Sequence, residues 1–368
     1  MKITAAVTVG PNTDFDLREV TIGDPRDNEV LVQIKGVGLC HTDIAARDGV
    51  YGLPYPLVLG HEGSGVVVST GSGVTKVSTG DHVAISFNSC GECTPCTKGS
   101  PAYCSQFAVY NYIGSRPDGT NPLGGLPDGE LHGHFFGQSS LASHAMASER
   151  NVVKIDKSIP LELVGPLGCG IQTGAGAVMR SMACPEGSTL LVLGAGPVGL
   201  AAVLGGVVQK CSKIIVSEPH AGRRDLALEL GATHVLDPAA GALTEQVREI
   251  CSEGVDFAFD TTGNVGVLKA AIESIASMGT LGLVGVPSDF SVDLPINIVA
   301  AMQGGLTVKG IVEGDSDPDE FIPELPDLYR VGKFPFDKMI TTFPMSDINK
   351  AVTAQHDGEV TKVVLVND

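Results

Sequence analysis

The chain has 368 residues, which is more than one hydrophobic core usually spans, so two domains are expected. Hydrophobic residues make up 43% of the chain and charged residues 18%, a balance that excludes a disordered or fibrous protein and favours a soluble α/β protein. The formal net charge of −18 would repel both nucleic acid and anionic lipid, so neither is expected as a partner.

The N-terminal residues and the lengths of the apolar runs indicate where in the cell the protein is expected. The chain starts Met1-Lys2-Ile3-Thr4, without the long apolar stretch of a secretory signal. Its longest apolar runs are far shorter than the ~20 residues that a membrane-spanning helix needs. A cytoplasmic protein is therefore expected, in which the nine cysteines stay reduced and are read as metal ligands or catalytic groups sooner than as disulfides.

The first ~150 residues carry short runs typical of β-strands, such as 29–34 and 66–68, separated by Gly, Pro and Asp turns. This pattern predicts an antiparallel, partly barrel-like region. Within it, the segment 114–133 is rich in Gly, Pro and Asp, and it is expected to form an exposed excursion rather than a buried element.

From about Gly170 the pattern changes to apolar strands that alternate with helical segments, as in a parallel, doubly wound sheet. The expected strands cover 190–193, 213–216, 255–259 and 282–286. After Gly310 the chain becomes charged and is interrupted by prolines. It ends in an expected strand at 361–366 that rejoins the first domain.

A glycine-rich turn follows the expected strand 190–193. The segment 194–199 has the pattern Gly-x-Gly-x-x-Gly and opens an apolar helix. The first glycine permits a tight turn, the second lets the backbone approach a pyrophosphate, and the third brings helix and strand close together. A triplet alone indicates only a tight turn, but this context favours dinucleotide binding. The residues expected to contact the cofactor here are Gly194, Gly196, Pro197, Val198 and Gly199.

An acidic residue is expected about 20 residues after such a turn, and Glu218 stands there at the end of the next predicted strand. Its carboxylate can accept hydrogen bonds from both ribose hydroxyls of NAD and would repel the extra phosphate of NADP, so NAD is favoured. His220, Arg223 and Arg224 are close by. They could bind that phosphate if Glu218 moved away, or the arginines could be solvated residues of the first helical turn.

Four cysteines lie close together in sequence, at Cys90, Cys93, Cys96 and Cys104. Four thiolates at such spacing can close a tetrahedron around Zn²⁺ with no open position, which is the arrangement of a structural site. An iron–sulfur cluster is the chemical rival. The motifs described next favour zinc.

A second set of possible ligands, Cys40, His61 and Cys169, is spread along the chain. A lone cysteine or histidine is more often a packed or hydrogen-bonded core residue than a ligand. Together these three supply two sulfurs and one imidazole, the set that leaves a fourth zinc position open for water or a substrate oxygen.

These motifs resemble the zinc-dependent medium-chain alcohol dehydrogenases. The matching features, in family order, are Gly60-His61-Glu62-x-x-Gly65 with Gly71 and Val74, the four-cysteine lobe, Gly168-Cys169-Gly170, and the fingerprint at Gly194. The resemblance covers essentially the whole chain. It implies a GroES-like catalytic domain at 1–170 and 310–368 with a structural zinc lobe at 86–110, a Rossmann domain at 171–309, and homodimers or homotetramers.

The resemblance also implies roles for single residues. The implied ligands of the catalytic zinc are Cys40, His61 and Cys169. Glu62 would be an acidic neighbour that coordinates transiently, Asp43 would orient the ligating histidine, and Thr42 would take the proton from the bound alcohol. Arg223 and Lys362 match cationic positions near the ribose and pyrophosphate, and Thr173, Val284 and Val286 match positions around the nicotinamide. Each of these five could equally be a packing residue.

The implied reaction oxidises a primary alcohol to an aldehyde, and reverses it. Zn²⁺ would lower the pKa of the alcohol, Thr42 would pass its proton onward, and the alkoxide would give hydride to NAD. Ala45 stands where many relatives carry the histidine that ends the proton relay. His41, where several relatives carry arginine, could contact the pyrophosphate or assist proton release. Bacterial benzyl (aryl) alcohol dehydrogenases resemble the chain at these positions, which favours aromatic or allylic alcohols.

Two other functions remain open. A thiol-adduct formaldehyde dehydrogenase would share both zinc sites but would need cations such as Arg47 and Arg116 to hold the carboxylates of its thiol cofactor. A non-catalytic scaffold on the same fold would bind about one zinc per chain rather than two. Ser86 and Phe87 are candidate walls of the substrate pocket, and Phe87 could equally be a core residue. The remaining cysteines, expected to be ordinary buried thiols, are Cys184, Cys211 and Cys251.

Overall fold

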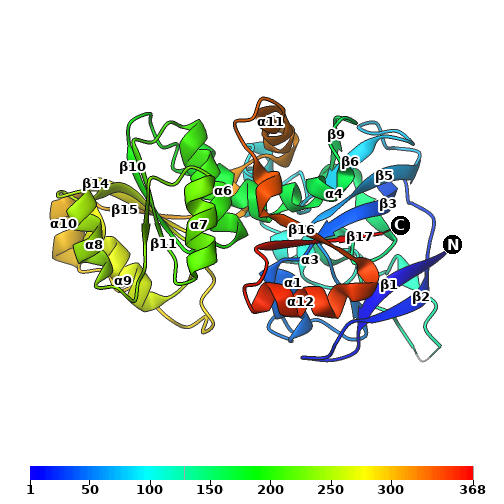
Figure 1. Ribbon diagram of the computed structural model, residues 1–368. Coiled ribbons are helices and arrows are strands. Elements are labelled where there is room, and N and C mark those ends of the chain that lie inside the picture. The colour runs from blue at the N-terminus through cyan, green and yellow to red at the C-terminus, as the bar shows by residue number, and fades with distance from the viewer. Residues whose placement is uncertain (128, 368) are drawn as a thin grey trace. The chain divides into compact units, whose positions relative to one another are not determined.

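The computed structural model describes residues 1–127 and 129–367, and the chain divides into two compact units (Figure 1). Unit 1 comprises Met1–Cys169, Asp317–Pro326 and Ile340–Asp368, and unit 2 comprises Gly170–Ser316 and Asp327–Met339. The chain leaves unit 2 after Ser316 rather than at the expected residue 310. The reason is local: the Ile311 amide continues the hydrogen bonding of a unit 2 strand, and the Glu313 carboxylate accepts a hydrogen bond from Thr173.

Unit 1 is built on two sheets of mostly antiparallel strands. The first has the order β4-β1-β2-β7, and the second, curled sheet has the order β16-β17-β3-β5-β6-β9, with β8 paired to β3. The strands are β1 (Lys2–Thr8), β2 (Asp16–Ile22), β3 (Glu29–Gly38), β4 (Leu57–Val58), β5 (Gly63–Thr70), β6 (His82–Ile85), β7 (Leu123–Gly124), β8 (His144–Ser148), β9 (Val152–Ile155), β16 (Ile340–Pro344) and β17 (Lys362–Val366). The helices are α1 (His41–Arg47), α2 (Thr94–Thr97), α3 (Phe107–Asn111), α4 (Leu161–Val164), α12 (Ile348–His356) and α11 (Pro318–Arg330), whose last residues belong to unit 2.

Strand β3 is the centre of unit 1 because both of its faces are buried. Val30, Val32 and Ile34 pack into the larger core, and Leu31, on the opposite face, packs into a second core with strand β1. The C-terminal strand β17, red in Figure 1, pairs antiparallel with β3, so Leu365 lies opposite Val37. The prediction that the last strand rejoins the first domain is therefore confirmed.

The excursion 114–133 is anchored more firmly than its composition suggests. Arg116 is only 7% exposed, and its guanidinium donates to both carboxylate oxygens of Glu29 at 2.5 and 2.9 Å. Leu123 and Leu131 are buried in the second core. The expectation of an exposed excursion is wrong for these three residues, because a few apolar and ionic anchors alternate with many turn residues. Asp128 lies outside the described residues.

Replacing Glu29 with glutamine is expected to destabilise unit 1 by about 3 kcal/mol at pH 7, because it leaves the Arg116 guanidinium buried without its counter-charge. Burial opposes ionisation of Glu29, but the hydrogen bonds from Arg116 and the Arg26 amide, together with the charge of Arg116, outweigh it and lower the pKa. The stabilisation is therefore present above the unfolded-state pKa of about 4.3 and is lost as the pH falls below it. Urea unfolding midpoints against pH test this: the gap between wild type and variant should close in acid. Glu19→Gln, which breaks an exposed pair with Lys2, should change the midpoint little.

Unit 2 contains a six-stranded, all-parallel sheet with the order β12-β11-β10-β13-β14-β15. Its strands are β10 (Thr189–Leu193), β11 (Lys213–Ser217), β12 (His234–Leu236), β13 (Val255–Asp260), β14 (Ile275–Leu283) and β15 (Thr307–Gly310). Its helices are α5 (Gly170–Gly176), α6 (Pro197–Val208), α7 (Ala221–Glu229), α8 (Leu243–Ile250), α9 (Val265–Ser274) and α10 (Ile298–Gly304). The chain reverses its direction of winding between β10 and β13, which is where doubly wound sheets bind dinucleotides.

The predicted parallel sheet is confirmed, but the strand expected at 282–286 is misplaced. It overlaps β14 only at residues 282 and 283, because β14 begins at Ile275 and ends where the Val284 and Gly285 amides turn to the Asp260 carbonyl. Within the part of the chain that the structure describes, no helix has the length and apolarity to span a membrane.

Candidate active site and metal centres

Four side chains from distant parts of unit 1 converge on one point. The ligand atoms of Cys40, His61, Glu62 and Cys169 all lie within 4.8 Å of one another. Cys40 caps the start of helix α1, and Cys169 follows a short turn. His61 and Glu62 directly precede strand β5. His61 and Glu62 are fully buried, whereas Cys40 and Cys169 are partly exposed as whole residues. Two sulfurs, one imidazole nitrogen and one carboxylate oxygen form a donor set that suits Zn²⁺.

The backbone before His61 can be made only by glycine. Gly60 has φ of +98°, and a Cβ there would lie 2.3 Å from the amide nitrogen of Leu141. Its amide also donates to the Asp43 carboxylate at 3.0 Å. This turn therefore fixes where the His61 side chain enters the site.

Asp43 links two of these residues through its carboxylate. One of its carboxylate oxygens lies 2.8 Å from His61 Nδ1, and the other accepts the backbone amide of Cys40 at 3.1 Å. Because the carboxylate can only accept, Nδ1 carries a proton, so in the neutral ring the lone pair is on Nε2. Nε2 is buried and has no hydrogen bond of normal geometry to any described residue. A histidine held this way is prepared to bind a metal through Nε2.

The charges of these converging side chains also favour the binding of a cation. A hydrogen bond from Cys169, together with the charge of His61, lowers the pKa of Cys40 well below its usual range despite burial. Burial alone would lower the pKa of His61, but the charges of Asp43 and Cys40 outweigh it and raise that pKa well above its usual range. A buried thiolate beside buried carboxylates is stabilised by positive charge, which a divalent metal supplies.

Lys362 supplies positive charge at the edge of the same group. Its ammonium lies 2.6 Å from Glu62 Oε2, both side chains are buried, and the ammonium also donates to the Leu39 carbonyl at 3.0 Å. Burial raises the pKa of Glu62 to about 7. The family resemblance implied a place for Lys362 near the ribose and pyrophosphate, and its pairing with Glu62 was not foreseen. A lysine at the head of the apolar run Val363 to Val366 was the available signal for a buried partner.

Thr42, the expected proton acceptor, lies in the first turn of α1 beside Cys40, and Tyr51 lies nearby. Sequence reasoning missed Tyr51. Burial and the nearby charge of Cys40 raise the pKa of its phenol, which is therefore neutral near pH 7. His41 is exposed at the start of the helix, and Ala45 is half-buried on the next turn.

Aromatic rings cover His61. The ring of Phe136 lies 4.5 Å from it and that of Phe135 5.7 Å, between ring centroids. Phe107 and Tyr112 pack around Phe136. Phe136 adopts a φ of +52°, a conformation that bulky residues rarely adopt and that is typical of strained functional segments. Sequence reasoning missed these rings because nothing in the run Phe135-Phe136 distinguishes a site from a core.

The two residues suggested as pocket walls have other contacts. Phe87 is buried in the larger core, with its ring 5.8 Å from that of Phe107. The Ser86 hydroxyl is buried and donates to the Gly168 carbonyl at 2.6 Å. Ser86 therefore fixes the turn that presents Cys169.

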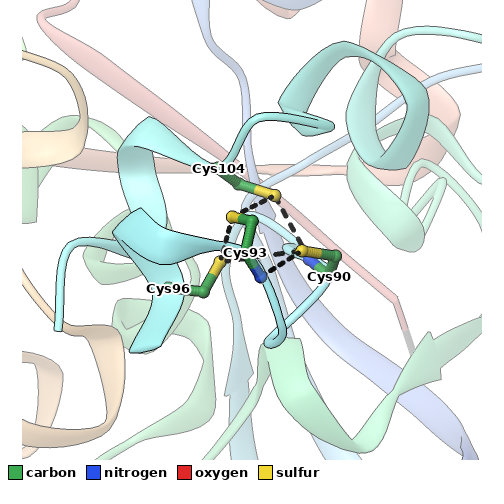
Figure 2. A group of neighbouring side chains, drawn as sticks. All are labelled: Cys90, Cys93, Cys96 and Cys104. Carbon is green, nitrogen blue, oxygen red and sulfur yellow. Dashed lines mark hydrogen bonds between the residues drawn. The ribbon is translucent and has the colours of Figure 1, made fainter. Parts of the chain in front are cut away.

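The four cysteines of the lobe point toward one another (Figure 2), with their sulfurs within 4.8 Å. The Cys93–Cys96, Cys93–Cys104 and Cys90–Cys96 sulfur separations are 3.5, 3.9 and 4.0 Å. Zinc–sulfur bonds of about 2.3 Å give tetrahedron edges of about 3.8 Å. Backbone amides of Cys93 and Ser105 donate to thiol sulfurs at 3.4 Å, as around metal-bound thiolates. This lobe is built to hold a four-coordinate metal.

In unit 2, the glycine turn opens onto a cavity of about 350 Å³. A Cβ at Gly199 would lie 1.9 Å from the Gly194 carbonyl oxygen, so that glycine is required by packing. A Cβ at Gly196 would meet no atom within 4 Å. Gly196 therefore keeps space free for something outside the chain, at the N-terminus of helix α6, where a phosphate group binds well.

Glu218 and Arg223 line this cavity, whereas Arg224 is paired outside its lining. Glu218 is buried, and its carboxylate accepts the Ala195 amide at 2.7 Å and the His220 amide at 2.9 Å. Arg224 is tied to Asp237 at 2.9 Å and to the Glu218 carbonyl. Arg223 lines the cavity, and its Nε lacks a hydrogen-bond partner among the described residues.

The residues expected around the nicotinamide differ in how exposed they are. Thr173 is buried in helix α5 and hydrogen-bonded to Glu313. Val284 is half-buried just after strand β14, and Val286 is 62% exposed. Pro197 and Val198 form the first turn of α6. Their cofactor contacts stay predictions.

Comparisons with known proteins agree on one family. Residues 26–157 match the alcohol dehydrogenase GroES-like domain, and residues 197–328 match the zinc-binding dehydrogenase family. The chain is 45% identical over 349 residues to geraniol dehydrogenase of Castellaniella defragrans, covering 94% of this chain and 93% of that protein. The crystal structure of benzyl alcohol dehydrogenase from Acinetobacter calcoaceticus superposes with a TM-score of 0.97 at 40% identity, covering 100% of both chains.

A more distant relative belongs to the formaldehyde branch. The chain is 34% identical over 371 residues to a probable S-(hydroxymethyl)glutathione dehydrogenase of Schizosaccharomyces pombe, covering 98% and 96% of the two chains. The expected GroES-like and Rossmann folds are confirmed by these matches. This chain belongs to the zinc-dependent medium-chain alcohol dehydrogenase family.

Proposed function

We propose that this alcohol dehydrogenase oxidises aromatic or allylic primary alcohols to aldehydes with NAD, and runs the reverse reduction. The observation that carries the proposal is the group of Cys40, His61 and Cys169, with Asp43 behind the histidine and the Phe136 ring 4.5 Å from it. The names of two relatives, a geraniol and a benzyl alcohol dehydrogenase, support an allylic or aromatic substrate.

Two zinc ions per chain are proposed, one at the Cys40 group and one at the four-cysteine lobe. At the first, bound Zn²⁺ would act as a Lewis acid that lowers the pKa of an alcohol hydroxyl. The chain's own residues do the rest: Asp43 keeps the His61 lone pair directed at the site, and Thr42 accepts the proton that the alcohol loses. The aromatic rings packed against His61 are buried, and they make this side of the group apolar, as an aromatic or allylic substrate would favour.

NAD is proposed over NADP because the Glu218 carboxylate lies at the mouth of the glycine turn, where it repels a phosphate on the ribose. Arg224 is already paired with Asp237, which leaves Arg223 as the cation nearest this carboxylate in the cavity lining. A cavity lined by one buried carboxylate and one arginine is expected to bind an uncharged ribose hydroxyl better than a phosphate group.

Gly196→Ala is expected to keep the fold and to weaken NAD binding by more than about tenfold. The φ of −72° at Gly196 suits alanine, and the added methyl meets no protein atom, so it would only block the approach of the pyrophosphate. Thermal unfolding and NADH fluorescence titration measure the two effects. Gly199→Ala is the contrast, because its methyl collides with the Gly194 carbonyl and should lower the melting temperature as well.

Thr42→Ala is expected to retain zinc and NAD binding but to lower kcat about 100-fold, because the alcohol then has no hydroxyl to take its proton. Thr42→Ser keeps the hydroxyl and should recover most of the rate. Steady-state kinetics with zinc analysis of each variant check this. Near-normal turnover by Thr42→Ala would remove Thr42 from the reaction.

The thiol-adduct formaldehyde function is less well supported by the two arginines suggested for it. Arg116 is buried on Glu29. Arg47 is paired with Asp48 at 2.7 Å, and its guanidinium lies 5.8 Å from the centre of the Phe15 ring. Both guanidinium groups are thus engaged within the chain, so neither supports a patch for an anionic thiol cofactor.

A homo-oligomer, dimer or tetramer, is proposed from the edge of the unit 2 sheet. Around edge strand β15 and helix α10, large apolar side chains are exposed: Met278, Ile298, Val299, Met302 and Val308. Exposed apolar surface next to an unpaired strand edge is what a second copy of a chain can cover. Sedimentation of the wild type against an Ile298→Asp variant tests this proposal.

The experiment for the function as a whole is NADH formation at alkaline pH with benzyl alcohol, cinnamyl alcohol, geraniol, ethanol, and formaldehyde plus a low-molecular-weight thiol, each with NAD and NADP. Turnover of the aromatic or allylic alcohols with NAD is the expected result. Activity confined to formaldehyde with thiol would move the chain to the other branch. A metal content near one zinc per chain, with no turnover, would favour a scaffold.

A further inference from the structure

We propose that Gln138 is a positioning residue for the zinc of the Cys40 group: its buried side-chain amide ties the backbone of His61 to the strand end that holds Cys169. This inference rests on the proposed function, in which zinc binds that group. Asp43 already links the first two ligands, so a second link to Cys169 fixes all three relative to one another.

The first half of the link is made to the backbone on either side of Glu62. Gln138 Nε2 donates to the His61 carbonyl at 2.8 Å, and Gln138 Oε1 accepts the Gly63 amide at 3.1 Å. Because one bond needs a donor and the other an acceptor, only one orientation of the side-chain amide satisfies both. A Cβ at Gly63 would lie 2.9 Å from Gln138 Oε1, so the glycine lets the amide come this close.

The second half of the link runs through the end of strand β6. Gln138 Nε2 also donates to the Ser86 carbonyl at 3.2 Å. The Ser86 hydroxyl donates to the Gly168 carbonyl at 2.6 Å, one residue before Cys169. A Cβ at Gly168 would lie 2.3 Å from the Ile85 carbonyl oxygen, so this turn packs directly on the strand end. A shift of the Gln138 amide would therefore move both backbone segments that carry ligands.

Burial makes these hydrogen bonds hard to replace. Gln138 is 2% exposed, and His61 and Ser86 are fully buried. A buried carbonyl or amide group that loses its partner cannot turn to water instead, so the backbone must shift to satisfy it. Loss of the Gln138 amide is therefore expected to change the arrangement of the ligands as well as the stability of the fold.

The segment 134–139, which carries Gln138, has an unusual backbone conformation. Three of its non-glycine residues adopt positive φ values between +52° and +62°: His134, Phe136 and Ser139. Such strain persists only where surrounding contacts enforce it, and it is concentrated at functional sites. The same segment places the Phe136 ring 4.5 Å from the His61 ring. It therefore holds the histidine through both its ring and its carbonyl.

The test measures how fast zinc leaves the zinc-loaded full chain in excess chelator, with Gln138→Met as the main variant. Methionine is similar in length to glutamine but has no N–H to donate. Two phases of release are expected, and the phase that His61→Ala lacks belongs to the Cys40 group. Gln138→Met is expected to speed that phase about 10- to 100-fold and to leave the phase of the four-cysteine lobe unchanged.

A second variant, Ser86→Ala, breaks the same link at its other half. It removes only the hydroxyl that holds the Gly168 carbonyl, so it tests the link with a smaller change to the core. It is expected to speed the same phase about tenfold. In the double variant the two effects should not multiply, because either change alone disconnects His61 from Cys169.

Cobalt(II) in place of zinc reports on the ligands without turnover. The visible absorption of cobalt in the Cys40 group, obtained by subtracting the spectrum of His61→Ala, should shift in Gln138→Met because the ligand atoms are no longer held in the same arrangement. A merely structural role would lower the melting temperature without moving these bands. In the zinc enzyme, kcat with benzyl alcohol is expected to fall about tenfold, with NAD affinity within twofold of the wild type.

Asn349 provides the matched control, because its side-chain amide makes the same two kinds of bond to backbone away from the ligands. It accepts the Phe15 amide at 2.9 Å and donates to the Phe15 carbonyl at 2.8 Å. Asn349→Leu is expected to lower the melting temperature but to leave both release phases and the cobalt absorption unchanged.

Several results would overturn the inference. Zinc release from Gln138→Met at the wild-type rate would do so, and where that variant does not fold, the same result in Ser86→Ala decides. Equal acceleration of both phases would show a general loosening of unit 1 instead. An effect of Gln138→Met with none in Ser86→Ala would overturn the link to Cys169.

Failure of the proposed function gives different results. A wild type that binds two zinc ions but oxidises no alcohol would overturn the proposed function alone, since zinc release and cobalt absorption still test the link. A wild type that holds zinc only in the four-cysteine lobe would overturn both.

Discussion

Replacing His61 with alanine is expected to remove one zinc of two per chain and to lower kcat with benzyl alcohol by at least about a thousandfold. The imidazole is the only nitrogen among the four converging ligands, and its removal leaves the buried Cys40 thiolate and the Asp43 carboxylate without the group between them. The change also opens a cavity under Phe136, so a lower melting temperature is expected as well.

Metal analysis of the purified variant and steady-state kinetics check this result. His144→Ala is the control, since that histidine is half-buried on strand β8 and is not among the converging ligands. It should keep both zinc ions and its activity. Asp43→Asn gives the intermediate case: its loss should weaken zinc binding at this site about 10- to 100-fold, because the amide no longer fixes the proton on His61 Nδ1. Two zinc ions and normal kcat in His61→Ala would place the chemistry elsewhere.

The parts of the molecule that could be predicted from sequence are those whose functional residues lie close together in the chain. Cys90, Cys93 and Cys96 lie within seven positions of one another, and one turn of backbone is enough to bring their sulfurs together. The glycine turn at 194 is also local, because strand, turn and helix are consecutive. Such motifs can be interpreted without knowledge of the rest of the fold.

The candidate catalytic group could be predicted only through resemblance. Cys40 and Cys169 are separated by more than a hundred residues, and neither has a sequence context that distinguishes a ligand from a buried thiol. The structure brings them together because the strands that precede them belong to one curled sheet.

What sequence reasoning missed depends on contacts between side chains far apart in the chain. The Glu62–Lys362 pair joins residues three hundred positions apart, and the Arg116–Glu29 pair fixes an excursion that composition alone made look exposed. Periodicity and composition carry no information on such pairings.

Replacing Cys93 with alanine is expected to have the largest effect on stability. The zinc of the four-cysteine lobe would be lost while that of the Cys40 group stays, so metal content falls from two to one per chain. Structural zinc in small peptides contributes about 10–16 kcal/mol of binding free energy, and part of that holds the lobe folded here. Apart from Pro101 and Ala102, which are buried, the lobe has little else to stabilise it: α2 has four residues, none buried, and most of its hydrogen bonds involve the cysteines themselves.

The expected readouts are a lower melting temperature, faster proteolysis confined to residues 90–104, and activity that survives at low temperature because His61 and its partners are untouched. Cys251→Ala is the control: that thiol is buried in the core of unit 2, so its loss should change neither metal content nor proteolysis of the lobe. A chelator titration of the wild type should reproduce the effect of Cys93→Ala. A Cys93→Ala variant that keeps two zinc ions and the melting temperature of the wild type would show that the lobe holds no structural metal.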